Sequence, residues 1–420
     1  MVALTLKTSP TAQPDFLSLP WATPLEDWPD EMAVRLPRGR HRHVVRFIDH
    51  EGVFFAFKEL PSPLAHKEFE LLDFLKEAGL PVVDLIGVAD QRVGPDGTEL
   101  EAVLITQHLR YSLPYLHLFA GPGSDGLHDK LVDALAVLLC RIHLAGFFWG
   151  DCSLGNALFR RDAGALVAYL VDTETSELQE SLTDGQRTHD LAIASDNIAG
   201  GLYELEALEK LPAEVDPIEV VDSLCVRYHD LWNELTRTDE LNGDELYRIT
   251  ERLQRLNDLG FDTEEMEILQ DDDGRRRVRF RPAVVEEGHH RRALERLTGI
   301  RAQENQARRL LRALHGYGAW LASEPGATEL PEAMMAYRWL TERYQPTVAA
   351  IPERLRSRLS EPEFYVQVIE HLWYLSEEAG RDYGLVNATN HYIENVLTGL
   401  PDEATLLLTD EGALTEDDQT

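Results

Sequence analysis

Lysine is scarce in this chain of 420 residues, because only six of its 40 basic residues are lysines. Arginine is therefore the usual cation, and a lysine inside an apolar segment needs a specific explanation, since the two side chains do different chemistry. Cysteine is scarcer still: Cys140, Cys152 and Cys225 lie far from any disulfide-pair or metal-ligand spacing. We expect three free thiols in a reducing compartment.

Positive charge is also in deficit, and the formal net charge is −34. Such a charge argues against nonspecific binding to nucleic acid or to an anionic membrane, and it favours small or cationic partners. The first ten residues have neither the basic start nor the apolar run of a signal peptide. The longest apolar segment, residues 131–150, is interrupted by Asp133, Arg141 and His143 and is too polar to span a bilayer. We therefore expect a cytoplasmic protein without a membrane span.

Strand and helix patterns alternate in the first half of the chain. A chain of this length predicts two or three domains, each able to bury a core. Short β-branched or aromatic runs and helical spacing of leucines predict the elements that follow the first 30 residues. These are a three-stranded meander within residues 32–60, a helix at 62–79, a strand at 101–109, a long helix at 126–146 and a strand at 165–172.

Helical periods dominate from about residue 205 to residue 400. One hairpin interrupts them, predicted from alternating apolar and polar residues at 265–270 and 277–282 around the turn sequence Asp-Asp-Asp-Gly. Residues 402–420 carry seven acidic residues and no basic one. The predicted parts of the chain are an arm at residues 1–30, a first domain at 31–210, a helical domain at 215–400 and a disordered acidic tail at 401–420.

Five polar residues stand at the edges of apolar segments in the first half: Lys58, Glu68, Asp151, Asn156 and Asp172. The protein-kinase-like fold presents its phosphotransfer residues in this order of strand, helix, loop and strand. A lysine binds the inner phosphates of a nucleotide, amide and carboxylate oxygens are hard ligands for magnesium, and a carboxylate can accept a hydroxyl proton. The predicted roles are phosphate binding for Lys58, positioning of that lysine for Glu68, the catalytic base for Asp151, and metal binding for Asn156 and Asp172.

The segment at residues 142–159, IHLAGFFWGDCSLGNALF, resembles the motif L-H-x-x-G-x-x-H-G-D-x-x-x-x-N-x-L of lipopolysaccharide kinases and RIO-type atypical kinases. Residues 66–82 resemble the helix R-E-x-x-x-L-x-x-L-x-x-x-G-x-P-V of these kinases, which selects Glu68. The later run Arg-Thr-His-Asp-Leu resembles their R-x-x-D-L motif. By this resemblance, Asp190 and His143 are structural supports of the catalytic loop.

The resemblance covers about residues 33–205 and implies a bilobal α+β fold, with a small antiparallel sheet lobe and a helical lobe, that uses ATP and Mg²⁺. The whole chain also resembles a bacterial family in which such a half precedes a helical domain of unknown function. Three departures from the kinase pattern stand out. Trp149 replaces the usual histidine, the metal motif reads Asp-Thr-Glu rather than Asp-Phe-Gly, and Gly39 is the only glycine in the expected nucleotide loop. Basic side chains crowd that loop: Arg38, Arg40, His41, Arg42 and His43.

These features favour ATP- and magnesium-dependent phosphotransfer to a hydroxyl acceptor, which is a sugar, a lipid-linked glycan or a protein. The alternatives are an inactive nucleotide-binding pseudokinase that engages a partner through its C-terminal half, and transfer of a nucleotidyl group. Residues 275–312 hold twelve arginines and four glutamates. This stretch either binds an anionic partner or pairs with acidic groups of the same chain. We favour pairing within the chain, and we expect Arg301, Arg308 and Arg312 to share one helix face.

Overall fold

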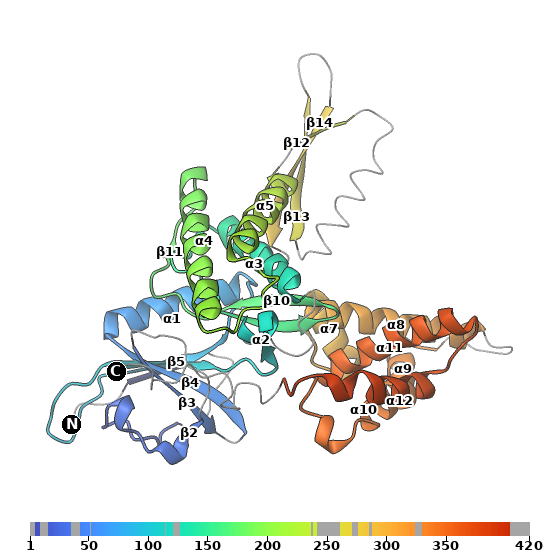
Figure 1. The fold of residues 1–420 in the computed structure, drawn as a ribbon, viewed down its shortest axis with the longest axis horizontal. Helices are drawn as coiled ribbons and strands as arrows, with labels where there is room; N and C mark the ends of the chain where they lie inside the picture. Colours follow the sequence, from blue (N-terminus) through green and yellow to red (C-terminus); the bar gives the residue numbers. More distant parts are fainter. Residues whose placement is uncertain are drawn as a thin grey trace.

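The computed structural model divides the chain into a sheet lobe, a helical lobe and a C-terminal helical domain (Figure 1). In Figure 1 these parts are mainly blue, green, and orange to red. The structure describes the following residues: 5–8, 16–34, 43–50, 52–113, 115–120, 127–236, 238–241, 261–270, 276–284, 288–323 and 330–403.

The sheet lobe contains one antiparallel sheet, whose strands within the described residues run in the order β1-β5-β6-β4-β3-β2. The strands are β1 (Thr5–Thr8), β2 (Ala33–Val34), β3 (Val44–His50), β4 (Val53–Leu60), β5 (Asp84–Asp90) and β6 (Ala102–Gln107). The predicted meander is confirmed as β2, β3 and β4, and the predicted fourth strand is β6. The sequence analysis predicted neither β1 nor β5.

Different segments of the chain pack on the two faces of this sheet. Phe55 and Phe57 of β4 point to one face, where they are buried with Trp28 and other residues of the N-terminal segment. Alternation along the strand places Lys58 and Leu60 on the opposite face, toward the following helix. Residues 16–30, which belong to the predicted arm, therefore pack on the sheet. The single-turn helices η1 (Leu25–Asp27) and η2 (Asp30–Met32) lie in this segment.

Helix α1 (Ser62–Glu77) covers the second face of the sheet. Pro63 in the first turn suits a helix start, and Gly79, with φ of 70°, follows the helix end. The predicted leucine stripe is buried at Leu71, Leu72 and Leu75. Glu68 lies on the same buried face, with only 1% of its surface exposed, so a carboxylate is aimed at the interior of the protein.

The helical lobe holds the predicted long helix as α3, together with two small sheets. Its elements are α2 (Tyr115–Ala120), α3 (Leu127–Leu144), α4 (Asp184–Ala207), α5 (Pro217–Thr236), β7 (Ser112–Leu113), β8 (Phe147–Phe148), β9 (Ala157–Asp162), β10 (Ala165–Leu170) and β11 (Glu177–Leu178). Strands β9 and β10 form a hairpin, and β7 pairs with β9. Helix α5 packs on α3 and α4. The hydrophobic core that includes α1, α3 and α4 therefore extends to Leu235 of α5. The three cysteines are free thiols.

The C-terminal part contains the predicted hairpin and a separate helical cluster. Its elements are β12 (Thr238–Leu241), β13 (Phe261–Gln270), β14 (Arg276–Val284), α7 (His289–Thr298), α8 (Glu304–Ser323), α9 (Glu332–Trp339), the π-helical turn η3 (Leu340–Tyr344), α10 (Gln345–Ala349), η4 (Glu353–Leu355), α11 (Glu361–Ala379), α12 (Leu385–Asn395) and η5 (Leu397–Gly399). The helices enclose a core that includes Leu310, Trp339 and Phe364. The predicted α+β class, with a helical domain after the two lobes, is confirmed. No helix in the described ranges has the length and apolar character of a bilayer span.

The basic stretch is partly described. Helix α8 begins at Glu304, so Arg301 lies in the segment before it. The prediction that Arg301 shares one helix face with Arg308 and Arg312 is therefore wrong. Arg301 pairs with Glu295 at 2.9 Å, and Arg309 pairs with Glu370 of α11. These contacts agree with pairing inside the chain. An anionic partner for Arg275–Arg312 stays a prediction.

The C-terminal domain contacts the helical lobe at the turn between β9 and β10. Asp162, at the end of β9, accepts the backbone N–H groups of Asn305 and Gln306 in the first turn of α8, at 3.1 and 2.8 Å. Glu403 pairs with Arg161 at 2.5 Å and is buried, although it lies in the predicted acidic tail. Residues 401–403 are therefore part of the folded structure. The tail prediction now concerns residues 404–420, which lie outside the described residues.

Burial of Asp162 leads to a prediction about pH. Burial raises the pKa of Asp162 to about 6, against the hydrogen bonds from α8 that lower it. The folded protein thus holds this proton more tightly than the unfolded chain, in which an aspartate has a pKa near 3.9. The stabilisation from protonated Asp162 is present below about pH 4 and is lost as the pH rises through 6. Urea unfolding from pH 4 to 7 should show a steeper decline for the wild type than for Asp162→Asn, whereas equal slopes would contradict the prediction.

Candidate active site

Lys58, Glu68 and Asp172 meet between the sheet lobe and the helical lobe. The Lys58 Nζ atom lies 3.0 Å from Glu68 Oε2 and 2.9 Å from Asp172 Oδ2. Lys58 comes from β4, Glu68 from the buried face of α1, and Asp172 from the segment directly after β10. The structure therefore brings together three of the residues that the sequence analysis placed in one site.

Glu174 is a fourth member of this cluster, and the sequence analysis did not assign it a role. Its Oε2 atom lies 3.3 Å from Lys58 Nζ, and its Oε1 atom lies 3.1 Å from His43 Nε2. It is the last residue of the Asp-Thr-Glu motif, at the position where the kinase motif has glycine. This glutamate in place of glycine was the feature of the sequence that could have indicated a role for Glu174. Glu174 therefore connects the segment that follows β10 to His43, which lies directly before β3.

The cluster carries an excess of negative charge. Burial opposes the charge on Lys58, but the carboxylates of Glu68 and Asp172 outweigh burial and raise the pKa of the Lys58 ammonium above its usual value. Burial, assisted by the charge of Asp172, raises the pKa of Glu68 to about 7. One ammonium group thus faces three carboxylates, counting Glu174. This arrangement favours the arrival of a divalent cation.

Asp151 and Asn156 are joined within one short loop. The Asn156 Nδ2 group donates to the backbone oxygen of Asp151 at 2.9 Å and to its Oδ2 atom at 3.1 Å. The loop is held between buried residues on both sides, Trp149 before it and Ala157 after it. Because the amide nitrogen of Asn156 is used in these bonds, its amide oxygen is the atom that could bind a metal ion.

Asn197 holds the second oxygen of Asp151, and the sequence analysis missed it. Its Nδ2 group donates to Asp151 Oδ1 at 3.1 Å and to the backbone oxygen of Cys152 at 3.2 Å. Asn197 lies on α4 seven residues after Asp190, so both residues lie on one face of the helix, two turns apart. That spacing was the only signal in the sequence.

If the site transfers a phosphoryl group, as proposed below, we expect Asn197→Ala to lower the rate about tenfold, because the variant frees one carboxylate oxygen of Asp151. The affinity for magnesium-ATP should stay within about twofold, since Lys58 and Asp172 are not changed. Steady-state kinetics and calorimetry would measure the two quantities. Ser195→Ala is the matched control on the same helix, since Ser195 bonds Leu191 and Cys225 rather than the loop. An Asn197→Ala rate equal to that of the control would show that Asn197 does not position the base.

Asp190 binds the backbone directly before Asp151, and His143 contacts Asp190. Asp190 accepts the backbone N–H groups of Trp149 and Gly150, both at 2.8 Å, and lies 3.0 Å from the Nε2 atom of His143. A carboxylate only accepts hydrogen bonds, so the Nε2 atom of His143 carries a proton. Its Nδ1 atom shares a hydrogen bond with the hydroxyl group of Tyr228 at 2.7 Å. Asp190 and the His143 side chain are fully buried. The departure at Trp149 also has a structural use, because its indole N–H donates to the backbone oxygen of Asp172 at 3.0 Å.

Gly39 is the one assigned site residue that lies outside the described residues. The same holds for the basic residues at positions 38, 40, 41 and 42. Of the expected nucleotide loop, the structure describes His43 and the start of β3. The contribution of Gly39 stays a prediction.

The donor set fits magnesium. No cluster of three or more His, Cys, Asp or Glu residues in the described ranges is arranged to hold a metal ion by itself. Magnesium does not need such a cage, since it keeps several waters and is held by one or two carboxylates together with substrate phosphates. Asp172, the amide oxygen of Asn156 and the neighbouring Glu174 supply hard oxygen ligands of this kind. The negative excess around Lys58 has the sign that such an ion would neutralise.

Comparison with known proteins places this site in a kinase-like domain. Residues 43–195 match the family model described as the lipopolysaccharide kinase (Kdo/WaaP) family. All the assigned site residues except Gly39 lie within that range. The resemblance that the motifs indicated is thereby confirmed, and the first half of the chain is kinase-like.

The second half matches a different family model. Residues 230–397 match a domain of unknown function, DUF4032. Among solved structures, one described as "WaaP in complex with acyl carrier protein" is similar over 55% of this chain and 90% of that chain. The sequence identity is 17% and the TM-score is 0.34. No curated protein matches the chain. The chain thus resembles the lipopolysaccharide kinase family in residues 43–195 and matches the DUF4032 model in residues 230–397.

Proposed function

We propose that this protein is an ATP- and magnesium-dependent phosphotransferase that acts on a hydroxyl acceptor. The observation that carries the proposal is the Lys58–Glu68 ion pair at 3.0 Å, joined at 2.9 Å to Asp172, with the Asp151–Asn156 loop in the same lobe as Asp172. A degenerate kinase usually lacks at least one of these groups. Every one of them is present here.

Each residue has a chemical task in this proposal. Lys58 binds and neutralises the inner phosphates, and Glu68 keeps the ammonium in place from the buried side. Bound magnesium would supply positive charge to the phosphates, and Asn156 and Asp172 would hold it. Asp151 accepts the proton of the acceptor hydroxyl or orients that hydroxyl for attack. Asn156 and Asn197 fix the two carboxylate oxygens of Asp151 for this purpose.

The principal rival is a non-catalytic nucleotide-binding scaffold that engages a partner through its C-terminal domain. The observation in its favour is the nucleotide loop, which contains only Gly39 among basic side chains. Nucleotidyl transfer is a second rival. ATP labelled in the γ- or the α-phosphate, incubated with sugar, lipid-linked glycan and protein acceptors, separates the three functions. Label transferred from the γ-phosphate supports the proposal. Label from the α-phosphate supports nucleotidyl transfer, and no transfer despite binding supports the scaffold.

Magnesium-ATP should raise the melting temperature of the protein by several degrees, because a ligand at a hundred times its Kd stabilises the folded state by about 2.7 kcal/mol. Asp172→Ala should abolish the part of this shift that depends on magnesium. Glu177→Ala, an exposed carboxylate a few residues further along, is the matched control and should keep the whole shift. If saturating magnesium-ATP produces neither a thermal shift nor heat in calorimetry, the nucleotide site is refuted.

The location of the protein and its domain boundaries are further parts of the proposal. We propose a cytoplasmic enzyme, in keeping with the free thiols and the acidic chain. The divisions at residues 31–210 and 215–400 also remain proposals, and the packing of α5 on α3 favours a first folding unit that reaches about residue 236.

A further inference from the structure

The β9–β10 hairpin joins the candidate active site to the C-terminal domain. Asn156 directly precedes β9, and Asp172 follows β10 after one residue. At this open end of the hairpin, the N–H group of Val171 donates to the backbone oxygen of Asn156 at 3.2 Å. The paired strands continue without a register shift to the pair Asp162–Ala165 at the closed end. One short ribbon therefore carries both predicted metal residues.

The closed end of the hairpin is inserted into the C-terminal domain. The Ala163 N–H group donates to Glu363 Oε2 of α11 at 2.8 Å, and Asp162 accepts two N–H groups of α8. Ala163 belongs to the hydrophobic cluster of the C-terminal domain rather than to that of the kinase-like lobes. Asp162, Ala163 and Glu363 are each less than 5% exposed. The turn is thus a docked element and not a free loop.

Glu363 is the centre of this docking site. Its Oε2 atom also accepts from Gln306 Nε2 at 2.8 Å, and its Oε1 atom accepts from Gln367 Nε2 at 2.7 Å. One buried carboxylate therefore ties the turn to both α8 and α11. Such hydrogen bonds are directional, so they determine the position of the turn and not merely its burial.

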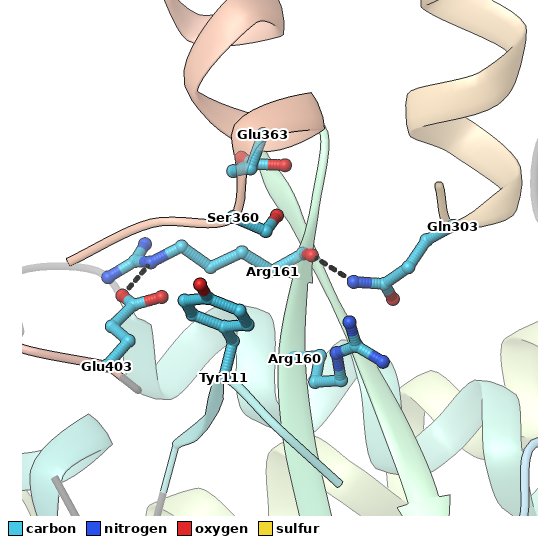
Figure 2. A pocket seen from close by; sticks show the side chains of 7 residues that line it. All are labelled: Tyr111, Arg160, Arg161, Gln303, Ser360, Glu363 and Glu403. Carbon is cyan, nitrogen blue, oxygen red and sulfur yellow. Dashed lines mark hydrogen bonds and ion pairs between the residues drawn. The ribbon is translucent and has the colours of Figure 1, made fainter. Parts of the chain in front are cut away.

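Polar contacts flank the turn on both strands. Figure 2 shows Arg161 reaching Glu403, and Gln303, directly before α8, donating to the backbone oxygen of Arg161; the distances are 2.5 and 2.6 Å. The Gln303 side chain also accepts from Tyr169 of β10 at 3.2 Å. Beside these contacts lies a small hollow that is lined by polar side chains. In the described residues, these polar contacts link both strands of the hairpin to the C-terminal domain.

The backbone of the turn needs this support. Ala163 has φ of 55° and Gly164 has φ of 85°, the two positive values of a tight two-residue turn. A residue with a Cβ atom rarely adopts the first of these conformations. Docking against Glu363 and the cluster of the C-terminal domain stabilises it.

We propose that the C-terminal domain is a positioning element of the phosphotransfer site: through Asp162, Ala163 and Glu363 it fixes the closed end of the hairpin whose open end carries Asn156 and Asp172. This inference rests on the proposed function for its catalytic meaning. Metal ligands must be held within about 0.5 Å of the productive geometry by the groups behind them. A two-stranded ribbon of six residues per strand, docked at its far end, provides such support. Asp162 and Glu363 are therefore positioning residues, remote from the reacting atoms.

The test compares three variants of the full chain by hydrogen exchange. Glu363→Ala removes the acceptor of the Ala163 N–H group, Glu363→Gln keeps an oxygen there, and Val368→Ala opens a cavity in the same domain, further along α11. We expect Glu363→Ala to raise exchange at least fivefold in residues 150–156 and 171–176, and Glu363→Gln to restore most of the protection. Val368→Ala should lower the melting temperature without this effect. Equal exchange in Glu363→Ala and Val368→Ala would overturn the inference.

Magnesium dependence provides the second measurement. The magnesium concentration that gives half-maximal nucleotide binding should rise about tenfold in Glu363→Ala and stay within twofold of the wild-type value in Val368→Ala, because loss of an outer support weakens metal binding by about that factor. An unchanged magnesium midpoint in Glu363→Ala would also overturn the inference. If the wild type binds no magnesium-ATP, the proposed function fails, but hydrogen exchange still decides whether the C-terminal domain positions the hairpin.

Discussion

Asp151→Asn is expected to lower phosphoryl transfer by about a thousandfold, within the range of 10²–10⁴ for loss of a general base. The variant keeps the shape of the side chain but removes the group that accepts the hydroxyl proton. It also replaces one carboxylate oxygen with an amide, so one of the two bonds from Asn156 and Asn197 is lost. Binding of magnesium-ATP should stay within about threefold, because Lys58 and Asp172 are unchanged. Single-turnover transfer from γ-labelled ATP and calorimetry measure the two effects.

Asp196→Asn is the matched control for this variant, since Asp196 is an exposed carboxylate on α4. It should leave transfer and binding unchanged. Transfer by Asp151→Asn at the wild-type rate would remove Asp151 from the role of base. A wild-type protein that binds magnesium-ATP and transfers no phosphoryl group to any acceptor would favour the scaffold.

The largest loss of stability is expected for Asp190→Ala, at about 3–5 kcal/mol in the free energy of unfolding. This carboxylate is fully buried and accepts from Trp149, Gly150 and His143. Its removal leaves three donors without an acceptor, of which those of Trp149 and His143 are buried and that of Gly150 is partly buried. A buried donor costs about 1–3 kcal/mol of desolvation if it stays unsatisfied. The loop that carries Asp151 should loosen, so transfer falls even at temperatures where the variant is folded. Urea unfolding and transfer assays at 15 °C would separate the two losses.

Asp196→Ala changes the same residue type on the exposed side of α4 and should shift stability by less than about 0.5 kcal/mol. If Asp190→Ala unfolds with the same midpoint as this control, the buried network does not hold the loop. Asp190→Asn should lose less stability than Asp190→Ala, because it keeps one acceptor oxygen for the backbone N–H groups.

Local pattern was enough to predict the elements and residues that meet at the edges of strong apolar segments. Lys58 lies within a run of alternating strand residues, and Glu68 lies on a leucine stripe. Asp151 and Asn156 are separated by five positions between two buried runs. In each case the sequence neighbours determine the direction of the side chain. The structure accordingly brings Lys58 and Glu68 into contact with Asp172, although the catalytic roles stay predictions.

Residues that act across the fold left no such pattern. Asn197 is one polar residue on a mixed helix, and its contact with Asp151 depends on how α4 crosses the catalytic loop. The tryptophans and tyrosines of the C-terminal helices show the same limit. Helical spacing within residues 334–344 and 370–384 predicts the tryptophans and tyrosines there as core. Trp339 is buried, but Trp373 and Tyr337 are 59% and 66% exposed. Which face of a helix is covered depends on its neighbours in space, and spacing alone does not contain that information.

The two-residue turn at Ala163 and Gly164 has a consequence for recognising relatives of this protein. An insertion at this point would break the contact between the turn and Glu363 of α11, whereas a hairpin that is free on the surface would tolerate extra residues. Kinase-like chains followed by this type of C-terminal domain should therefore keep an acidic residue, a small residue and a glycine at positions 162–164, with no change in length. Chains that lack the domain should vary freely there. The length of one turn thus becomes a marker, readable in a sequence alignment, of whether the two halves of such a protein work together.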